Sequence, residues 1–313
     1  MHATTHDPVT DTLDERGARS DPPADANVAH PHCPNKDGKP PYRRIASPLK
    51  WHGGKSYLAT KIVELMPPHR TYLEPYAGGL SVLLAKDPDN TSEIVNDLNR
   101  HLSNFHSVLA DQERFPAFHR IVKNILFSEV AWEESRGSLD KPCDDSVKRA
   151  VDFFVCCRQS LAGRMDSFAP ITQRRLRRRM NEQASAWCSA VDGLPLVHER
   201  FRGVVVLNQE ATAVLTKYDD SDVVAYLDPP YPPESRVSPE VYEHEMTLQQ
   251  HEELLDVVQA CKAKILLSSY PNDLYEQRLK NNKEWHQHTF DVPNHASGLR
   301  KKERKQEVVW TNF

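Results

Sequence analysis

Apolar residues along the chain repeat with two spacings, one typical of buried strands and one typical of helices. Short runs rich in β-branched and aromatic residues predict strands at 71–76, 93–97, 203–208, 223–227 and 264–270. Helical spacing predicts helices at 58–65, from 82 onward, at 211–215, 247–261 and 273–279. The segments 285–292 and 307–313 alternate like paired antiparallel strands. The sequence therefore predicts an α/β fold whose parallel sheet is closed by an antiparallel pair.

The middle of the chain has a different pattern. Helical spacing recurs there in the ranges 101–127, 146–161 and 172–187. No strong strand signal lies between Asp97 and Phe201. We therefore expect a helical insert at 104–200, within a domain made of 43–103 and 201–313.

Composition narrows the classes of protein to consider. The chain has 313 residues and a formal net charge of −4, so any surface that binds a polyanion must be local. Its six cysteines form no Cys-x-x-Cys pair, and no apolar run approaches the roughly 20 residues of a membrane span. The first residues lack the basic and apolar segments of a secretory signal. We expect a cytoplasmic protein that does not enter the membrane, with a monomer as the default.

The first 42 residues differ from the rest in composition. They are poor in apolar side chains and rich in Asp, Pro, Ala and His, so they cannot bury enough surface to offset the cost of ordering. We expect a disordered tail at 1–42. A metal site formed by His30, His32 and Cys33 is a disfavoured alternative, and we expect no metal in the protein.

The strongest chemical signal is the sequence Asp228-Pro229-Pro230-Tyr231, directly after the apolar run 223–227. Two prolines cannot continue a central strand, so the chain must leave the sheet at its carboxyl edge, where ligands bind in open α/β sheets. The Asp228 carboxylate and the Pro229 carbonyl are hydrogen-bond acceptors, and the Tyr231 ring offers a flat face. These groups suit a planar group that carries an NH₂. The alternative is a proline turn with a buried tyrosine.

A second signal is a glycine loop, Ala77-Gly78-Gly79-Leu80-Ser81, between a predicted strand and a predicted helix. This order opens the nucleotide-binding units of α/β folds, although it also occurs as a simple packing turn. Asp97 ends the next strand about 20 residues later, where an acidic side chain commonly accepts the hydroxyls of a ribose. The alternative role for Asp97 is the N-cap of the helix that follows.

Gly54-Lys55-Ser56 resembles part of a phosphate-binding loop but does not fit it. The first glycine of that motif would fall at position 49, which is Leu, and no strand precedes it. What remains is a glycine turn, Lys55 and the predicted start of a helix. This combination suits a carboxylate, because free N–H groups and the helix dipole favour an anion.

Five arginines occupy six positions within the predicted helix 172–187. They are Arg174, Arg175, Arg177, Arg178 and Arg179, and Arg158 and Arg164 lie upstream. Guanidinium groups suit phosphates and the major-groove edge of guanine. A solvated helix face is the alternative, but few carboxylates offset these charges, so we favour contact with DNA.

The assembled pattern resembles the DNA adenine-N6 methyltransferases, a family that includes Dam-like, phage and restriction-modification enzymes. Four motifs carry the resemblance: Lys50-Trp51-His52-Gly53-Gly54-Lys55, Glu74-Pro75-Tyr76-Ala77-Gly78-Gly79-Leu80-Ser81, Asn96-Asp97-Leu98-Asn99 and Asp228-Pro229-Pro230-Tyr231. Further support comes from Tyr242-Glu243-His244-Glu245-Met246, Leu267-Ser268-Ser269-Tyr270 and Glu307-Val308-Val309-Trp310-Thr311-Asn312. The resemblance covers roughly 46–313. It implies a Rossmann-like S-adenosylmethionine-dependent methyltransferase sheet, with target recognition in the helical insert.

The resemblance also implies roles for single residues. The predicted cofactor-binding set for S-adenosyl-L-methionine is Trp51, Lys55, Glu74, Tyr76, Ala77, Gly78, Gly79, Asp97 and Glu210. Trp51 and Lys55 would hold the methionine end, and Asp97 would accept from the ribose. Glu210 would lie near the cofactor adenine, although many relatives have Asp there. Two departures from the family pattern, His52 and Leu80, fall near the predicted cofactor site without removing a needed group.

The implied reaction is methyl transfer to the N6 amino group of adenine in double-stranded DNA. The target base leaves the duplex and stacks on Tyr231, while Asp228 and the Pro229 carbonyl accept from its amino group. Other acceptors, namely cytosine N4, an RNA base or a protein glutamine, remain alternatives, as does a catalytically silent DNA-binding regulator. A partner restriction endonuclease would be a separate chain.

Overall fold

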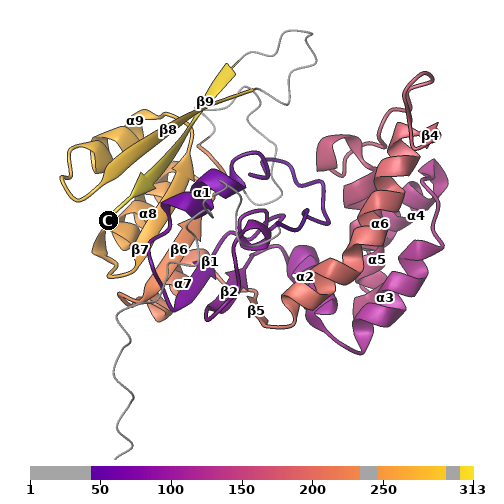
Figure 1. Cartoon of the computed structure of the whole chain (residues 1–313), viewed down its shortest axis with the longest axis horizontal. Coiled ribbons are helices and arrows are strands. Elements are labelled where there is room, and N and C mark those ends of the chain that lie inside the picture. The colour runs from indigo at the N-terminus through magenta and orange to yellow at the C-terminus, as the bar shows by residue number, and fades with distance from the viewer. Residues whose placement is uncertain (1–43, 233–244, 294–303) are drawn as a thin grey trace, which may run out of the picture. The chain divides into compact units, whose positions relative to one another are not determined.

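The computed structural model describes residues 44–232, 245–293 and 304–313, and a seven-stranded sheet organises them (Figure 1). Its strands are β1 (Thr71–Glu74), β2 (Ser92–Asn96), β5 (Val204–Leu207), β6 (Val223–Leu227), β7 (Lys264–Ser269), β8 (His286–Pro293) and β9 (Arg304–Thr311). Their order in the sheet is β5-β2-β1-β6-β7-β9-β8. In this order, every pair of neighbouring strands from β5 through β2, β1 and β6 to β7 is parallel. Strand β9 pairs antiparallel with both β7 and β8. The expected Rossmann-like α/β sheet with an antiparallel closing pair is confirmed.

Two layers of apolar side chains cover the two faces of this sheet. Successive residues of a strand point to opposite faces, so Tyr72 belongs to one layer and Leu73 to the other. The Leu73 layer packs against α7 (Ala211–Lys217), α8 (Leu248–Ala260), α9 (Asp273–Tyr275) and the adjoining π-helical turn η4 (Glu276–Lys280). The Tyr72 layer includes Ile62 of α1 (Ala59–Leu65) and continues into the helical insert. Both faces are thus buried, as expected for parallel strands.

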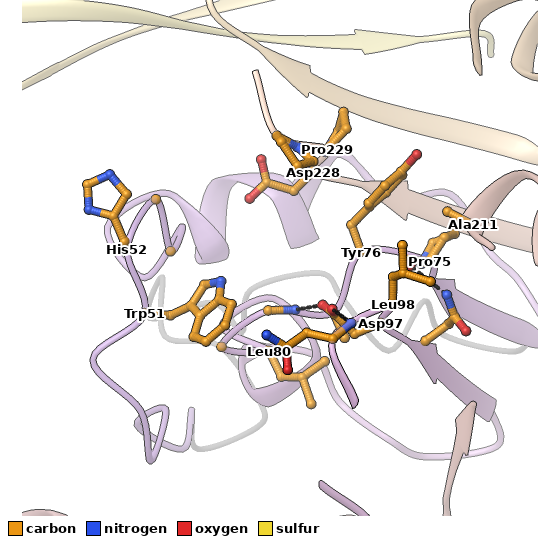
Figure 2. Close-up of a pocket in the computed structure, with 18 of the residues that line it drawn as sticks. Trp51, His52, Pro75, Tyr76, Leu80, Asp97, Leu98, Ala211, Asp228 and Pro229 are labelled. Carbon is orange, nitrogen blue, oxygen red and sulfur yellow. Dashed lines mark hydrogen bonds between the residues drawn. The ribbon is translucent and has the colours of Figure 1, made fainter. Parts of the chain in front are cut away.

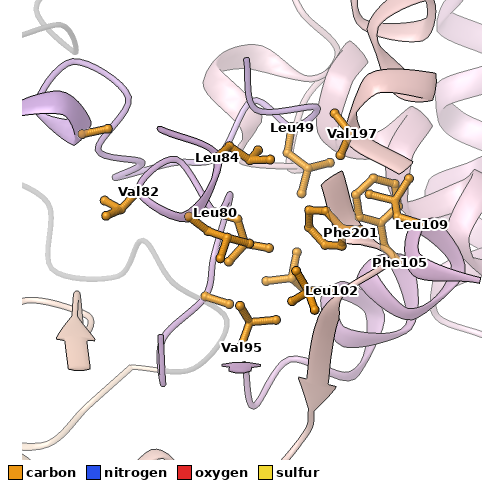
Figure 3. Close-up of a cluster of buried hydrophobic side chains, with 14 of the residues drawn as sticks. Leu49, Leu80, Val82, Leu84, Val95, Leu102, Phe105, Leu109, Val197 and Phe201 are labelled. Carbon is orange, nitrogen blue, oxygen red and sulfur yellow. The ribbon is translucent and has the colours of Figure 1, made fainter. Parts of the chain in front are cut away.

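Five helices form the main part of the insert. They are α2 (Arg100–Ala110), α3 (Arg114–Lys123), α4 (Glu129–Leu139), α5 (Ser146–Gln159) and α6 (Glu182–Phe201). The chain enters through α2 directly after β2 and returns through α6 into β5. Figure 3 shows Phe105 of α2 and Phe201 of α6 in one apolar cluster with Leu80 of the glycine loop. The insert is therefore packed on the same loop that was predicted to hold a cofactor. The boundaries of the insert at 104 and 200 stay a prediction.

Two predicted helices are wrong. The segment from Val82 forms a single 3₁₀ turn, η1 (Leu83–Ala85), after which the chain is extended toward Pro88. The segment 172–181 is not helical: β3 (Leu176–Arg177) and β4 (Met180–Asn181) form a short antiparallel hairpin, and α6 begins at Glu182. Asn181 explains this start, because its side chain accepts a hydrogen bond from the Gln183 backbone N–H and caps α6.

One acidic and two basic side chains are buried together where the insert rejoins the sheet. Arg200 of α6 donates to both carboxylate oxygens of Glu93 on β2, at 2.5 and 2.7 Å. The Lys86 ammonium lies 3.1 Å from the same carboxylate, and all three side chains are buried. The pKa of Lys86 is lowered by its burial, an effect that the Glu93 charge opposes. The carboxylate is the shared counter-charge of two buried cations.

We expect Glu93→Leu to lower the free energy of unfolding by about 3–5 kcal/mol, because it leaves two buried cations facing each other. Urea denaturation would measure the change. Glu199→Leu is the matched control, because Glu199 pairs with Arg202 on the exposed side of α6 and should change stability by no more than about 0.5 kcal/mol. Equal effects of the two substitutions would contradict this assignment.

Candidate active site

A cavity of about 800 Å³ lies at the carboxyl edge of the sheet (Figure 2). It is formed where β1, β2, β5 and β6 end, because parallel strands in register bring their following loops to one edge. All nine residues predicted to bind the cofactor line it, together with Asp228, Pro229 and Pro230. Figure 2 shows the side chains of Trp51, Tyr76, Asp97 and Asp228 arranged around one space. Their individual binding roles stay predictions.

An ion pair between the buried Lys55 and the partly exposed Asp228 joins two of the predicted motifs. The Lys55 ammonium lies 2.8 and 2.9 Å from the two carboxylate oxygens of Asp228, and it donates to the Gly53 carbonyl at 2.8 Å. The Lys55 side chain is 5% exposed. The helix predicted at 58–65 begins at Ala59. Lys55 is therefore bonded to the predicted catalytic carboxylate, and its expected contact with a cofactor carboxylate stays a prediction.

Tyr231 does not line the cavity. Its ring is 4% exposed, lies edge-on to Tyr270 with centroids 4.6 Å apart, and has the Lys55 ammonium 4.7 Å from its centroid. Its hydroxyl donates to Glu307 at 2.9 Å. In this arrangement the ring offers no open face for a stacked base, because neighbouring side chains surround it. The residues at 233–244 that follow lie outside the described structure.

The glycine loop and Asp97 are held together by the backbone. The Gly78 N–H donates to one Asp97 carboxylate oxygen at 2.9 Å, and the Asn99 N–H donates to the other at 2.9 Å. The N-cap of α2 is Asn99, whose side chain accepts from the Leu102 N–H, so the alternative role of Asp97 as that cap is wrong. A carboxylate oxygen can accept more than one hydrogen bond, so this arrangement is compatible with a further donor from a ligand.

Gly78 is required by the close approach of Trp51. Its φ is +47°, and a Cβ there would lie 2.7 Å from the indole nitrogen of Trp51. Two residues later, Leu80 also has a positive φ of 53° and is buried. The loop thus presents bare backbone to the cavity beside an aromatic ring. This is the form of a loop that a ligand can approach closely.

Asn96 is a positioning residue that motif reasoning did not single out. Its amide nitrogen donates to the carbonyls of Pro75 and Gln209 at 3.0 and 2.9 Å, and its oxygen accepts from the Gln209 N–H at 2.8 Å. One buried side chain therefore ties the loops after β1 and β5 to the end of β2 and places Glu210 at the cavity. Asn96 lies next to Asp97 at the end of a buried strand, and this position in the sequence could have indicated its role.

Burial perturbs the carboxyl group of Glu74, which lies at the base of the cavity. Its pKa is raised well above the ordinary value by burial, and the hydrogen bond from the Tyr72 hydroxyl at 2.8 Å opposes this shift only in part. The nearby charge of Asp228 raises the pKa of Glu74 further. The Glu74 carboxyl group therefore holds its proton more readily than an exposed glutamate does.

The seven arginines predicted to contact DNA fall into three environments. The five at 174–179 are exposed on the β3–β4 hairpin and the segment before it. Arg164 is exposed and lines the cavity. Arg158 packs inside the insert, donates to the Ala186 carbonyl at 3.0 Å, and has its pKa lowered by burial. The hairpin thus presents most of the predicted positive charge.

Comparison with known proteins points to the same chemistry. Residues 51–296 match the model of the family described as D12 class N6 adenine-specific DNA methyltransferase. The chain is also similar to the retron Ec67 DNA adenine methylase of Escherichia coli, with 33% identity over 117 residues. That alignment covers 37% of this chain and 40% of the relative, so the match spans about two fifths of the relative's length.

We expect Gly78→Ala to lower the free energy of unfolding by about 1–3 kcal/mol, because alanine is strained at this φ and its Cβ displaces the Trp51 indole. Urea denaturation followed by tryptophan fluorescence would measure both effects. Gly137→Ala is the matched control: Gly137 lies within α4 with open space around it, so alanine should stabilise the protein by about 0.5–1 kcal/mol. Destabilisation by both substitutions would contradict the assignment.

Proposed function

The chain belongs to the D12 class N6 adenine-specific DNA methyltransferase family, and on that premise we propose that it transfers a methyl group from S-adenosylmethionine to the N6 amino group of adenine in DNA. The observation that carries the proposal is the position of Asp228 and Pro229. Both lie at the rim of the cavity that also contains the glycine loop and Asp97. An amino-group acceptor and a nucleotide-binding loop therefore share one cavity.

The residues around the cavity fit S-adenosylmethionine, which supplies an electrophilic methyl group when bound. The volume of about 800 Å³ is within the usual range for small-molecule sites. Asp97 would accept from the ribose hydroxyls, and Glu210 would lie beside the adenine. The bare backbone at Gly78 would allow close approach beneath Trp51. The Lys55 ammonium binds Asp228 in this structure, and its contact with the methionine end of the cofactor stays a prediction.

Catalysis in this proposal depends on positioning and electrostatics. The flipped adenine would place its amino group between the Asp228 carboxylate and the Pro229 carbonyl, which accept its two hydrogens. These two hydrogen bonds would take the nitrogen lone pair out of conjugation with the ring and direct it toward the methyl group. The Lys55 ammonium would hold the Asp228 carboxylate in a fixed direction. Stacking on Tyr231 would require its ring to become more exposed than the 4% of this structure.

The exposed hairpin supports DNA as the substrate. Within the described residues, the hairpin arginines form a single ion pair, between Arg175 and Glu182 at 3.8 Å, so most of their charge is not offset locally. Arg178 and Arg179 form the turn with φ of 53° and 64°, a geometry that usually selects Asn or Gly. Guanidinium groups at the tip of a hairpin are well placed to bind phosphates.

The proposal extends to the oligomeric state, the compartment and the form of DNA on which the protein acts. A monomer in the cytoplasm that acts on double-stranded DNA, with or without a restriction endonuclease encoded elsewhere, is the simplest arrangement. A catalytically silent regulator would keep the fold but would not need the Lys55–Asp228 pair, whose desolvation is costly. Among the described residues, the structure contains no helix whose length and hydropathy would let it span a bilayer.

The direct test is methyl transfer from labelled S-adenosylmethionine to unmethylated duplex DNA, followed by nucleoside analysis. We expect N6-methyladenine, and we expect Asp228→Ala to reduce the rate about a hundredfold or more while the cofactor still binds. Product on cytosine N4, on RNA or on a protein glutamine would replace the proposed acceptor. Cofactor binding without transfer to any acceptor would favour the regulator.

Neutralising the hairpin should weaken DNA binding without affecting the cofactor. For Arg174→Gln/Arg177→Gln we expect weaker binding at low salt and a smaller dependence of log Kd on log salt, by about one for each phosphate that the variant no longer binds. Cofactor affinity should stay unchanged, because neither residue lines the cavity. Arg202→Gln is the control, an exposed arginine paired with Glu199. An unchanged salt dependence in the double variant would exclude the hairpin as the DNA-binding element.

A further inference from the structure

A buried carboxylate on the last strand lies next to the site but takes no part in the chemistry proposed above. Glu307 of β9 is 2% exposed. Both of its carboxylate oxygens accept hydrogen bonds from phenol hydroxyls: Tyr57 donates at 2.6 Å and Tyr231 at 2.9 Å. An ionised carboxylate inside a protein is costly unless such partners are supplied. A buried carboxylate next to the apolar residues 308–310 therefore calls for an explanation.

The two tyrosines connect Glu307 to both halves of the Lys55–Asp228 ion pair. Tyr57 follows Lys55 by two residues, and Tyr231 follows Asp228 by three. Two cross-links thus join the same two segments: the ion pair itself, and the bridge Tyr57–Glu307–Tyr231. One cross-link would leave the segments free to pivot about it, whereas two restrict their relative orientation.

The charges are also coupled. Burial is the main cause of the raised pKa of Glu307, and the Asp228 charge raises it further. The Lys55 charge and the two tyrosine hydrogen bonds act in the opposite direction. A single ammonium therefore stabilises two carboxylates, one by direct contact and one at longer range.

We infer that Glu307 is a positioning residue of the methyl-transfer site, whose carboxylate clamps Tyr57 and Tyr231 and thereby holds Lys55 and the Asp228–Pro229 loop in the arrangement that receives the amino group. The inference rests on the proposed function for the reaction itself. The carboxylate form favours the clamp, because protonation converts one of its two acceptor oxygens into an O–H donor and weakens that oxygen as an acceptor for a tyrosine hydroxyl.

Glu307→Gln tests the clamp with little change of shape. We expect kcat for DNA methylation to fall about ten- to hundredfold, since small misplacements of reacting groups have effects of this size, while the Kd for S-adenosylmethionine changes less than about twofold. Glu284→Gln, an exposed glutamate at the turn before β8, is the control and should leave kcat unchanged. A loss of kcat and cofactor affinity together would indicate general damage and overturn the positioning role.

The pH profile gives a second test, with a readout that a purely structural role would not alter. Because the pKa of Glu307 is raised, the wild-type kcat should fall as the pH is lowered through a value above that of an ordinary glutamate. The Gln variant cannot take up this proton, so its lower rate should lack that acidic limb. An identical acidic limb in both proteins would assign the ionisation to another group and overturn the proposal.

Hydrogen–deuterium exchange tests for the clamp independently of the proposed methyl transfer. In Glu307→Gln we expect faster exchange in peptides that contain Tyr57 and in peptides that contain Tyr231, with β8 unchanged. Unchanged exchange in both peptides would overturn the clamp whether or not the protein methylates DNA. Absence of methyl transfer by the wild type would overturn the proposed function, while the exchange result would still decide whether the clamp exists.

Discussion

The ion pair between buried Lys55 and partly exposed Asp228 is the interaction on which the site depends. Removing two charges from water is costly, and their attraction compensates only when geometry and further hydrogen bonds are favourable. The Gly53 carbonyl supplies one such bond to Lys55 at 2.8 Å. The abrupt end of β6 at two prolines supplies the other requirement, because it turns the Asp228 side chain out of the sheet toward the cavity. Fold and site are therefore linked through one short loop.

The central strands could be predicted from the sequence because burial on both faces requires apolar runs, and such runs were visible at 223–227 and 264–270. The edge strand β5 was also predicted from an apolar run, at 203–208, although its Val205 is 49% exposed. The cavity residues could also be predicted, because they directly follow strand ends. The ion-pair partner of Lys55 could not be predicted, because Asp228 lies 173 positions away and only the fold brings the two side chains together. Glu307 was missed for the same reason: its tyrosine partners come from segments distant in sequence.

The hairpin was mistaken for a helix for a different reason. The residues Leu176, Met180, Ala184 and Trp187 have helical spacing, yet Leu176 is 73% exposed and Met180 is 40% exposed, so the first two are not part of a buried stripe. The turn contains neither Gly nor Asn, the residues that normally signal positive φ. Holding two arginines in this conformation costs free energy that an ordinary surface turn would not require.

The insert is in direct contact with the segment that contains Lys50 and Trp51, next to the glycine loop. A Cβ at Gly163, which follows α5, would lie 1.6 Å from the carbonyl oxygen of Lys50. The Cys157 thiol lies 3.1 Å from the same oxygen, and the Phe153 ring packs 6.3 Å from Trp51. Because close-packed contacts transmit displacement, a shift of the insert on DNA would move Trp51 and the glycine loop beside it. With the proposed function, binding of DNA and binding of the cofactor would then be coupled through the packing of the insert.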